Sequence, residues 1–184
     1  MKKVTLLGDS IRQIGYGKTV AEALEKEGVE VFQPEENCRF ARYTFRMLFD
    51  YKEQIEGSDV IHWNNGLWDV SDLFGDGQFT PTEEYVETMS RIADVLLKIT
   101  PNVIFATTTP VKEGYPYQNS EDIARLNSAV LPVLKAKGIT VNDLYSAVYP
   151  VKEEVLRDDD MIHLNDKGIE ICTEKVLEAI RKKL

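Results

Sequence analysis

Short strand-forming runs alternate with helical patterns along the whole chain, and this alternation constrains the fold more than any other feature. Neighbouring parallel strands need crossover connections, which are usually helices, so this order predicts a five-stranded parallel sheet with helices on both faces, an α/β fold. The 184 residues contain no repeat or linker, which predicts one domain over residues 1–184. The expected strands are residues 3–7, 29–32, 60–63, 102–107 and 139–141, and the expected helices include 18–27, 39–52 and 120–137.

Two further helices have sequence signals at their ends. Thr80 is a candidate N-cap, Pro81 suits the first helical position, and Glu83 completes a capping box. Asn165 is a candidate cap for the last helix. Both segments have an apolar stripe at helical spacing, which predicts a buried face. The stripes are Tyr85, Met89, Ile92 and Leu96, and Ile169, Cys172, Val176 and Ile180.

The charge and composition exclude several classes of protein. The net charge of −9 argues against nucleic acid as a partner, because binding a phosphate backbone requires clustered Lys and Arg. No apolar run is long enough to span a membrane, and the N-terminus does not resemble a signal peptide. Two cysteines are too few for a disulfide scaffold or a cysteine metal site. We therefore expect a cytoplasmic protein with no membrane or nucleic-acid partner and no cofactor or metal.

Ser10 follows the first expected strand in the segment Gly8-Asp9-Ser10. In parallel α/β folds, ligands bind beyond the carboxyl ends of the strands, so this loop is a place to seek chemistry. A serine on a sharp turn suits a nucleophile, provided that a base takes its proton. The same residues also suit an ordinary turn in which Asp9 or Ser10 caps the next helix. A phosphate-binding loop is a weaker alternative, because the glycine spacing of such loops is absent.

His163 is the candidate base. His62, the other histidine, lies inside an expected strand, where a buried structural role is more common. Asp160 precedes His163 by three residues, so one turn can bring its carboxylate to the imidazole and fix the tautomer that accepts a proton. A solvated acidic loop at residues 158–160 is the alternative, and a metal site formed by the same residues is less favoured.

The loops after the second and third strands contain candidate substrate and oxyanion ligands. Asn64 and Asn65 precede Gly66 at the end of a buried strand, and such amides can stabilise a tetrahedral oxyanion. An ordinary Asn-Gly turn is the alternative explanation for these residues. The segment that contains Asn37, Cys38 and Arg39 leads into a helix, whose amides point toward the expected cleft. Arg39 and Arg42 can meet a polar substrate or pair with nearby carboxylates, while Cys38 most often becomes a small buried side chain.

The order of these segments resembles the four blocks of the SGNH (GDSL-type) hydrolase family. Gly8-Asp9-Ser10 and Asp160-x-x-His163 are its most specific matches, and the resemblance spans nearly the whole chain. It implies a flavodoxin-like three-layer α/β/α sandwich. It also implies Ser10 as the nucleophile, His163 as the base and Asp160 as its orienting acid. The implied oxyanion hole consists of the N–H of Ser10, a second-block N–H and a third-block Asn.

Two positions depart from the family's pattern. Cys38 stands where the second block usually has glycine, although its backbone N–H is retained. The third block is usually Gly-x-Asn-Asp, whereas here Trp68 occupies the Asn position in Gly66-Leu67-Trp68-Asp69. The third oxyanion donor is then Asn64, Asn65 or the Trp68 indole, and we favour Asn65.

The resemblance implies a serine esterase that acts on a small-molecule ester. We expect a short acyl group, such as acetyl, on a carbohydrate, since no apolar stretch indicates a lipid tunnel. Asn64, Asn37, Arg39 and Trp68 are the candidate substrate-binding residues. A lysophospholipase or thioesterase of the same family is the first alternative. A catalytically silent glycan- or nucleotide-binding module is the second. The sequence predicts no oligomeric state.

Overall fold

The computed structural model describes residues 1–184 and contains a single five-stranded sheet in which all strands are parallel. The strand order is β2-β1-β3-β4-β5, so the chain moves to one side of β1 and then to the other. All five strands lie at or close to the residues expected from the sequence. They are β1 (Lys3–Leu7), β2 (Glu30–Phe32), β3 (Val60–Asn64), β4 (Val103–Ala106) and β5 (Thr140–Asn142).

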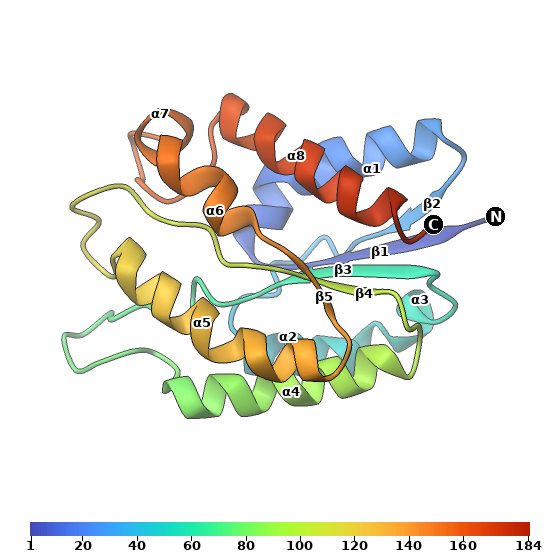
Figure 1. Cartoon of the computed structure of the whole chain (residues 1–184), viewed down its shortest axis with the longest axis horizontal. Coiled ribbons are helices and arrows are strands. Elements are labelled where there is room, and N and C mark those ends of the chain that lie inside the picture. Colours follow the sequence, from blue (N-terminus) through green and yellow to red (C-terminus); the bar gives the residue numbers. More distant parts are fainter.

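Helices cover both faces of the sheet and form three layers, as expected for an α/β/α sandwich (Figure 1). One layer contains α1 (Gly17–Lys26), α6 (Leu144–Val148) and α8 (Asp166–Arg181), and the other contains α2 (Ala41–Asp50), α4 (Thr82–Leu97) and α5 (Ser120–Ala136). None of the helices combines the length and the apolar character needed to cross a membrane. The five-residue helix α6 was not expected from the sequence, and neither were four other short elements. They are a π-helical turn (Ile11–Tyr16), α3 (Lys52–Ile55), a 3-10 turn (Tyr149–Val151) and α7 (Lys152–Val155).

The predicted N-terminal cap is present in α8 but not in α4. Asn165 caps α8, since its side-chain oxygen accepts the N–H groups of Lys167 and Gly168. The capping box at Thr80 was wrong. Pro81 is the N-cap of α4, its ψ of 141° is extended, and no side chain caps the helix. Thr80 lies before the helix, where its N–H donates to the carbonyl of Asp69 (3.0 Å).

The sheet and the inward faces of the helices form one continuous hydrophobic core. Tyr85, Met89, Ile92 and Leu96 are fully buried in it, as the stripe on α4 predicts. Trp63 also lies in this core, with its ring against that of Phe105 (5.1 Å between centroids). The core leaves the carboxyl ends of the strands to the loops, which lie on the left of Figure 1.

Candidate active site

Ser10 lies at the carboxyl end of β1, one residue before the π-helical turn. Gly8 lets this turn pass close to β3, because a Cβ at residue 8 would lie 1.9 Å from the Asn64 side-chain oxygen. The turn is closed by Asp9, whose Oδ1 accepts the N–H of Ile11 (3.0 Å) and whose carbonyl accepts that of Gln13 (3.0 Å). No protein acceptor takes the N–H of Ser10, so this donor remains available to a ligand.

His163 lies in a tight loop that precedes α8. Leu156 and Leu164 pair as an antiparallel bridge, and the N–H of Arg157 donates to the carbonyl of His163 (2.8 Å). Met161, inside this loop, has a φ of 63°, a left-handed conformation that is strained for a residue with a side chain. The Met161 carbonyl accepts the N–H of Lys112 (2.9 Å), which ties the loop to the segment after β4.

The structure brings Ser10, His163 and Asp160 into one hydrogen-bonded chain. Ser10 Oγ lies 2.8 Å from His163 Nε2, and His163 Nδ1 lies 2.9 Å from Asp160 Oδ2. Asp160 Oδ1 accepts the backbone N–H groups of His163 (2.9 Å) and Ile162 (3.1 Å). Partial burial alone would raise the pKa of Asp160, but the bonds from His163 and Ile162 outweigh it and lower that pKa. An ionised Asp160 holds the proton on Nδ1 and leaves Nε2 free to accept one from Ser10.

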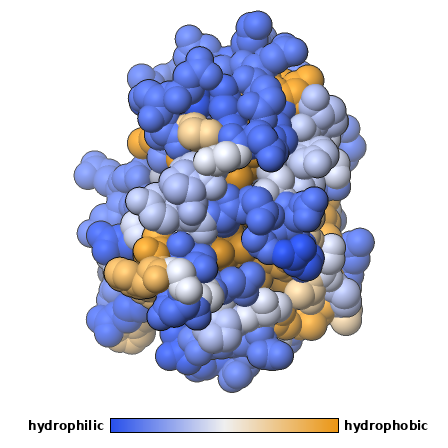
Figure 2. Space-filling view, turned by 90° about the vertical axis from the view of Figure 1, so that its left-hand side faces the viewer, coloured by the Kyte–Doolittle hydropathy of each residue, from blue (hydrophilic) through white to orange (hydrophobic).

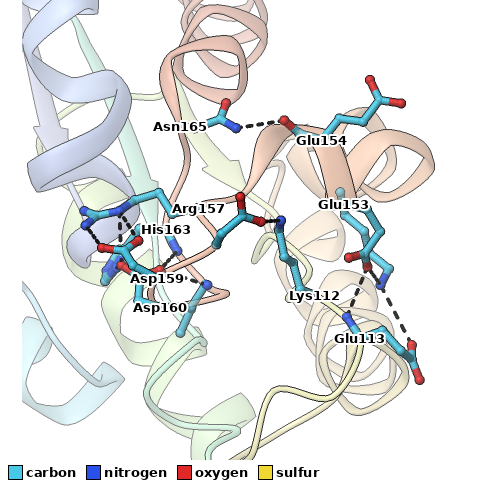
Figure 3. A network of polar contacts seen from close by, with 12 residues as sticks. Lys112, Glu113, Glu153, Glu154, Arg157, Asp159, Asp160, His163 and Asn165 are labelled. Atoms are coloured by element: carbon cyan, nitrogen blue, oxygen red, sulfur yellow. Dashed lines mark hydrogen bonds and ion pairs between the residues drawn. The ribbon is translucent and has the colours of Figure 1, made fainter.

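Ion pairs on both sides hold the loop that contains Asp160 (Figure 3). The Arg157 guanidinium pairs with Asp159, and its Nε lies 3.4 Å from Asp160 Oδ2. On the other side, the largely buried Lys112 extends its ammonium to the carboxylate of Asp158. The loop is therefore fixed by both backbone and side-chain contacts, which favours a constant distance between His163 and Ser10.

The side chain of Asn64 is engaged by two buried residues next to the loop that contains Ser10. Its amide nitrogen donates to Asp9 Oδ1 (2.8 Å), and its oxygen accepts the hydroxyl of the buried Tyr16 (2.9 Å). Asp9 and Tyr16 are both fully buried. Burial raises the pKa of Asp9 despite the hydrogen bond from Asn64. These contacts argue against a substrate-binding role for Asn64.

The expected oxyanion donors Cys38 and Asn65 are already hydrogen-bonded within the protein. The backbone N–H of Cys38 donates to the carbonyl of Gly8 (3.0 Å), and burial raises the pKa of its thiol. The Asn65 amide nitrogen donates to the carbonyl of Arg39 (2.9 Å), and its oxygen accepts the indole N–H of Trp63 (2.7 Å). We therefore correct both expectations, because these groups join loops to each other.

A cleft of about 470 Å³ opens over Ser10 and His163. Two of the predicted substrate ligands, Asn37 and Trp68, line it, whereas Asn64 and Arg39 do not. Most of the other residues that line the cleft were not predicted, because no sequence pattern marks a loop side chain as lining a cleft. These residues include Ile14, Leu67, Leu73, Phe79, Tyr115 and Tyr117.

The arginines near the expected cleft have structural partners. Arg12 is buried, and its guanidinium donates to the carbonyls of Pro34 (2.7 Å) and Glu36 (2.8 Å). Arg42 pairs with Glu84 (2.7 Å), while the Arg39 guanidinium lies over the ring of Tyr43 (4.8 Å). Pairing with nearby carboxylates was the alternative to a substrate role for Arg39 and Arg42. The structure shows such a pair for Arg42, whereas Arg39 stacks on an aromatic ring and has no carboxylate partner.

Asp69 joins the third block to α2. Both of its carboxylate oxygens lie 3.1 Å from the N–H of Ala41, the first residue of that helix. Burial raises the pKa of Asp69 to about 6, although this N–H and the hydroxyl of Thr80 oppose the shift. No group of three or more His, Cys, Asp or Glu side chains has an arrangement that could hold a metal ion.

Comparisons with known proteins agree with this fold. No protein-family model matches the chain. It is 26% identical over 167 residues to "GDSL esterase/lipase WDL1" of Oryza sativa subsp. japonica, which covers 79% of this chain and 62% of that protein. The chain thus spans less than two thirds of the length of this relative.

Solved structures with the same fold cover nearly the whole chain. A lipase/acylhydrolase from Enterococcus faecalis is 24% identical, with a TM-score of 0.82 over 100% of this chain and 97% of its own. The acetyl xylan esterase AlAXEase is 20% identical, with a TM-score of 0.79 over 97% and 99%. A variant of Axe2, an acetyl xylan esterase from Geobacillus stearothermophilus, is 17% identical, with a TM-score of 0.80 over 100% and 96%.

Proposed function

We propose that this chain is an SGNH (GDSL-type) hydrolase and that it hydrolyses a carboxylic ester through Ser10, His163 and Asp160. One observation carries the proposal. Ser10 Oγ, both ring nitrogens of His163 and a carboxylate oxygen of Asp160 form a continuous hydrogen-bonded chain that ends in an open cleft. A silent binding module would have no need of this arrangement.

In the first half-reaction, Ser10 Oγ attacks the ester carbonyl while His163 Nε2 takes the hydroxyl proton. The tetrahedral intermediate collapses when the imidazolium returns this proton to the alcohol oxygen, which leaves an acyl group on Ser10. Water then attacks the acyl-enzyme, and His163 again removes and returns the proton. Proton transfer of this kind contributes about 10² to 10⁴-fold to the rate. Asp160 orients the ring and stabilises its charged form.

The oxyanion of the intermediate needs donors that the protein itself does not use. The backbone N–H of Ser10 is one such donor. Asn37 is a second candidate, because its oxygen accepts the N–H of Arg39 (2.7 Å) while its amide nitrogen has no protein acceptor. Trp68, in the position of the family's Asn, is the third, since it lines the cleft and its indole N–H has no protein acceptor. We propose that the oxyanion hole draws on these groups.

The test is hydrolysis of p-nitrophenyl acetate by wild type and Ser10→Ala, together with intact mass after treatment with a fluorophosphonate probe. We expect turnover and a single adduct in the wild type and neither in Ser10→Ala. Ser128→Ala is the matched control. Ser128 lies on α5, where its hydroxyl donates to the carbonyl of Ala124 (2.7 Å), so its loss should change neither readout. A folded wild type that neither turns over nor labels would support the binding module instead.

An acetyl ester of a carbohydrate is the finer candidate for the substrate. The names of two structural neighbours favour it, since both are acetyl xylan esterases. Release of acetate from acetylated xylo-oligosaccharides, measured against p-nitrophenyl acetate turnover, tests this candidate. The apolar lining of the cleft favours a longer acyl group instead.

A further inference from the structure

The cleft over Ser10 has an apolar wall that comes largely from one segment. Leu67, Trp68, Leu73 and Phe79 all lie between β3 and α4, and all line the same cleft. Tyr115 and Tyr117 extend this wall from the segment after β4. Ser10 and His163 line the same cleft, so an ester bound at Ser10 lies in the cleft that this wall encloses.

Five apolar side chains of the cleft lining are exposed, whereas Leu67 is buried. The exposed fractions are 54% for Ile14, 41% for Trp68, 44% for Leu73, 47% for Phe79 and 44% for Tyr117. Figure 2 shows apolar residues in a hollow of this face, surrounded by hydrophilic surface. A contiguous apolar patch that is exposed on a protein surface often marks a binding site. The wall therefore provides contact area that an apolar ligand would cover.

The polar groups of the cleft are few and uncharged. No Lys, Arg, Asp or Glu lines it, although these residues make up 29% of the chain. Beyond Ser10 and His163, the polar side chains of the lining are Gln13, Asn37 and Ser71, with the Trp68 indole N–H and two tyrosine hydroxyls. A sugar ring needs several hydrogen-bond partners and an anionic headgroup needs a cation, whereas an aliphatic chain needs neither.

We propose that this cleft binds the acyl chain of the substrate, and that esters with acyl chains of about six to eight carbon atoms are preferred to acetyl esters. The inference deepens the proposed ester hydrolysis and rests on it. We assign the chain to the acyl side because the acyl group stays bonded to Ser10 Oγ through both half-reactions. The alcohol leaves after the first.

The first test is kcat/KM for p-nitrophenyl esters with acyl chains of two, four, six and eight carbons, each below its aggregation limit. A fully buried methylene is worth about fourfold in kcat/KM. With partial burial, we expect the hexanoate and octanoate to exceed the acetate by about tenfold or more. An acetate that equals or exceeds the longer esters overturns the inference, while Ser10-dependent acetate turnover still supports ester hydrolysis.

Leu73 and Phe74 form a matched pair for the second test. They are neighbours in one loop, but Leu73 lines the cleft, whereas Phe74 is 84% exposed and does not. Leu73→Asp places a charge against the chain, and we expect the octanoate-to-acetate ratio of kcat/KM to fall about tenfold or more. Phe74→Asp adds the same charge to the same loop and should leave the ratio unchanged. Equal effects of the two variants would contradict the assignment.

A third series separates the two sides of the ester. Acetate esters of straight-chain alcohols with two to eight carbons are compared with ethyl esters of straight-chain acids of the same lengths. A length dependence on the acid side only, lost in Leu73→Asp, is the expected result. A dependence on the alcohol side only would overturn the acyl assignment.

Discussion

Each carboxylate oxygen of Asp160 has a separate task. Oδ1 accepts the N–H groups of His163 and Ile162 and so shapes the loop, whereas Oδ2 holds the imidazole at Nδ1. A substitution that keeps the first oxygen and changes the second therefore tests the orientation of the base without disturbing the backbone.

Asp160→Asn makes this change. The amide oxygen can still accept the two backbone N–H groups, but the amide nitrogen then donates to His163 Nδ1 and leaves the ring proton on Nε2. We expect kcat for p-nitrophenyl acetate to fall by about 10² to 10⁴-fold, with little change in KM. Asp159→Asn is the control, because Asp159 pairs with Arg157 and does not contact the imidazole. Similar kcat values for the two variants would argue against an orienting role for Asp160.

At the scale of single residues, the sequence predicted what local spacing determines. Asp160 and His163 meet because three residues separate them on one turn, and Ser10 was placed by the end of a strand. The prediction that Cys38 and Asn65 donate to the oxyanion is not supported, because the direction of a donor depends on its tertiary partner. The carbonyl of Gly8 takes the N–H of Cys38, and that of Arg39 takes the amide of Asn65. No pattern within either segment encodes these pairings.

At the scale of elements, Asn165 connects α8 to the loop that contains His163. Its Oδ1 accepts the N–H groups of Lys167 (3.1 Å) and Gly168 (3.2 Å), and its Nδ2 donates to the carbonyl of Glu154 (2.8 Å). The cap therefore satisfies two of the free N–H groups at the start of α8 and also fixes the segment that precedes the loop.

Asn165→Ala should lower the free energy of unfolding by about 1 to 2 kcal/mol, because it removes the cap and the bond to Glu154. Asn165→Asp retains the oxygen acceptor, and its charge suits a helix N-terminus, so it should recover the share of the loss that comes from the cap but not the bond to Glu154. Urea unfolding at neutral pH measures both values. If Asn165→Ala and the wild type have the same stability, the cap contributes nothing and this account of α8 is wrong.

The N-termini of α8 and α4 also show that a tertiary contact can override a capping signal in the sequence. Asn165 was predicted because its cap is local, with acceptor and donors within three residues. Thr80 has the sequence of a cap, yet its N–H is engaged by Asp69, a residue of the preceding loop. The contact holds Thr80 outside the helix, and α4 begins at Thr82 without a side-chain cap.

At the scale of the whole molecule, alternation of strands and helices was enough to predict the layers, the parallel sheet and the edge that carries the site. The cleft wall was not predictable in the same way. Leu73, Phe79 and Tyr117 lie in loops without periodic pattern, and only the folded chain brings them around Ser10. The sequence therefore predicted the residues of the hydrogen-bonded chain better than it predicted the walls of the cleft.

His62 couples the stability of the entire domain to pH. It is fully buried in β3, with Tyr16 at its edge (5.7 Å between ring centroids), and Asn142 Nδ2 lies 3.2 Å from its Nε2. Its Nδ1 has no partner. Burial lowers the pKa of His62 to about 3, whereas an unfolded histidine titrates near its ordinary value of 6.5. Between these values the unfolded chain binds a proton that the folded chain does not.

Stability must then fall as the pH is lowered from about 6.5 toward 3, by up to about 1.4 kcal/mol per pH unit from this residue. Between pH 7.5 and 4.5 we expect His62 to contribute about 2 to 3 kcal/mol of lost unfolding free energy. His62→Gln keeps an acceptor for Asn142 but has no proton to gain, so its loss over the same range should be smaller by that amount. Urea unfolding of both proteins at the two pH values gives the comparison. The difference cancels the carboxyl groups, which titrate in both chains. If the two proteins lose the same unfolding free energy, low pH destabilises this domain through its carboxyl groups and not through His62.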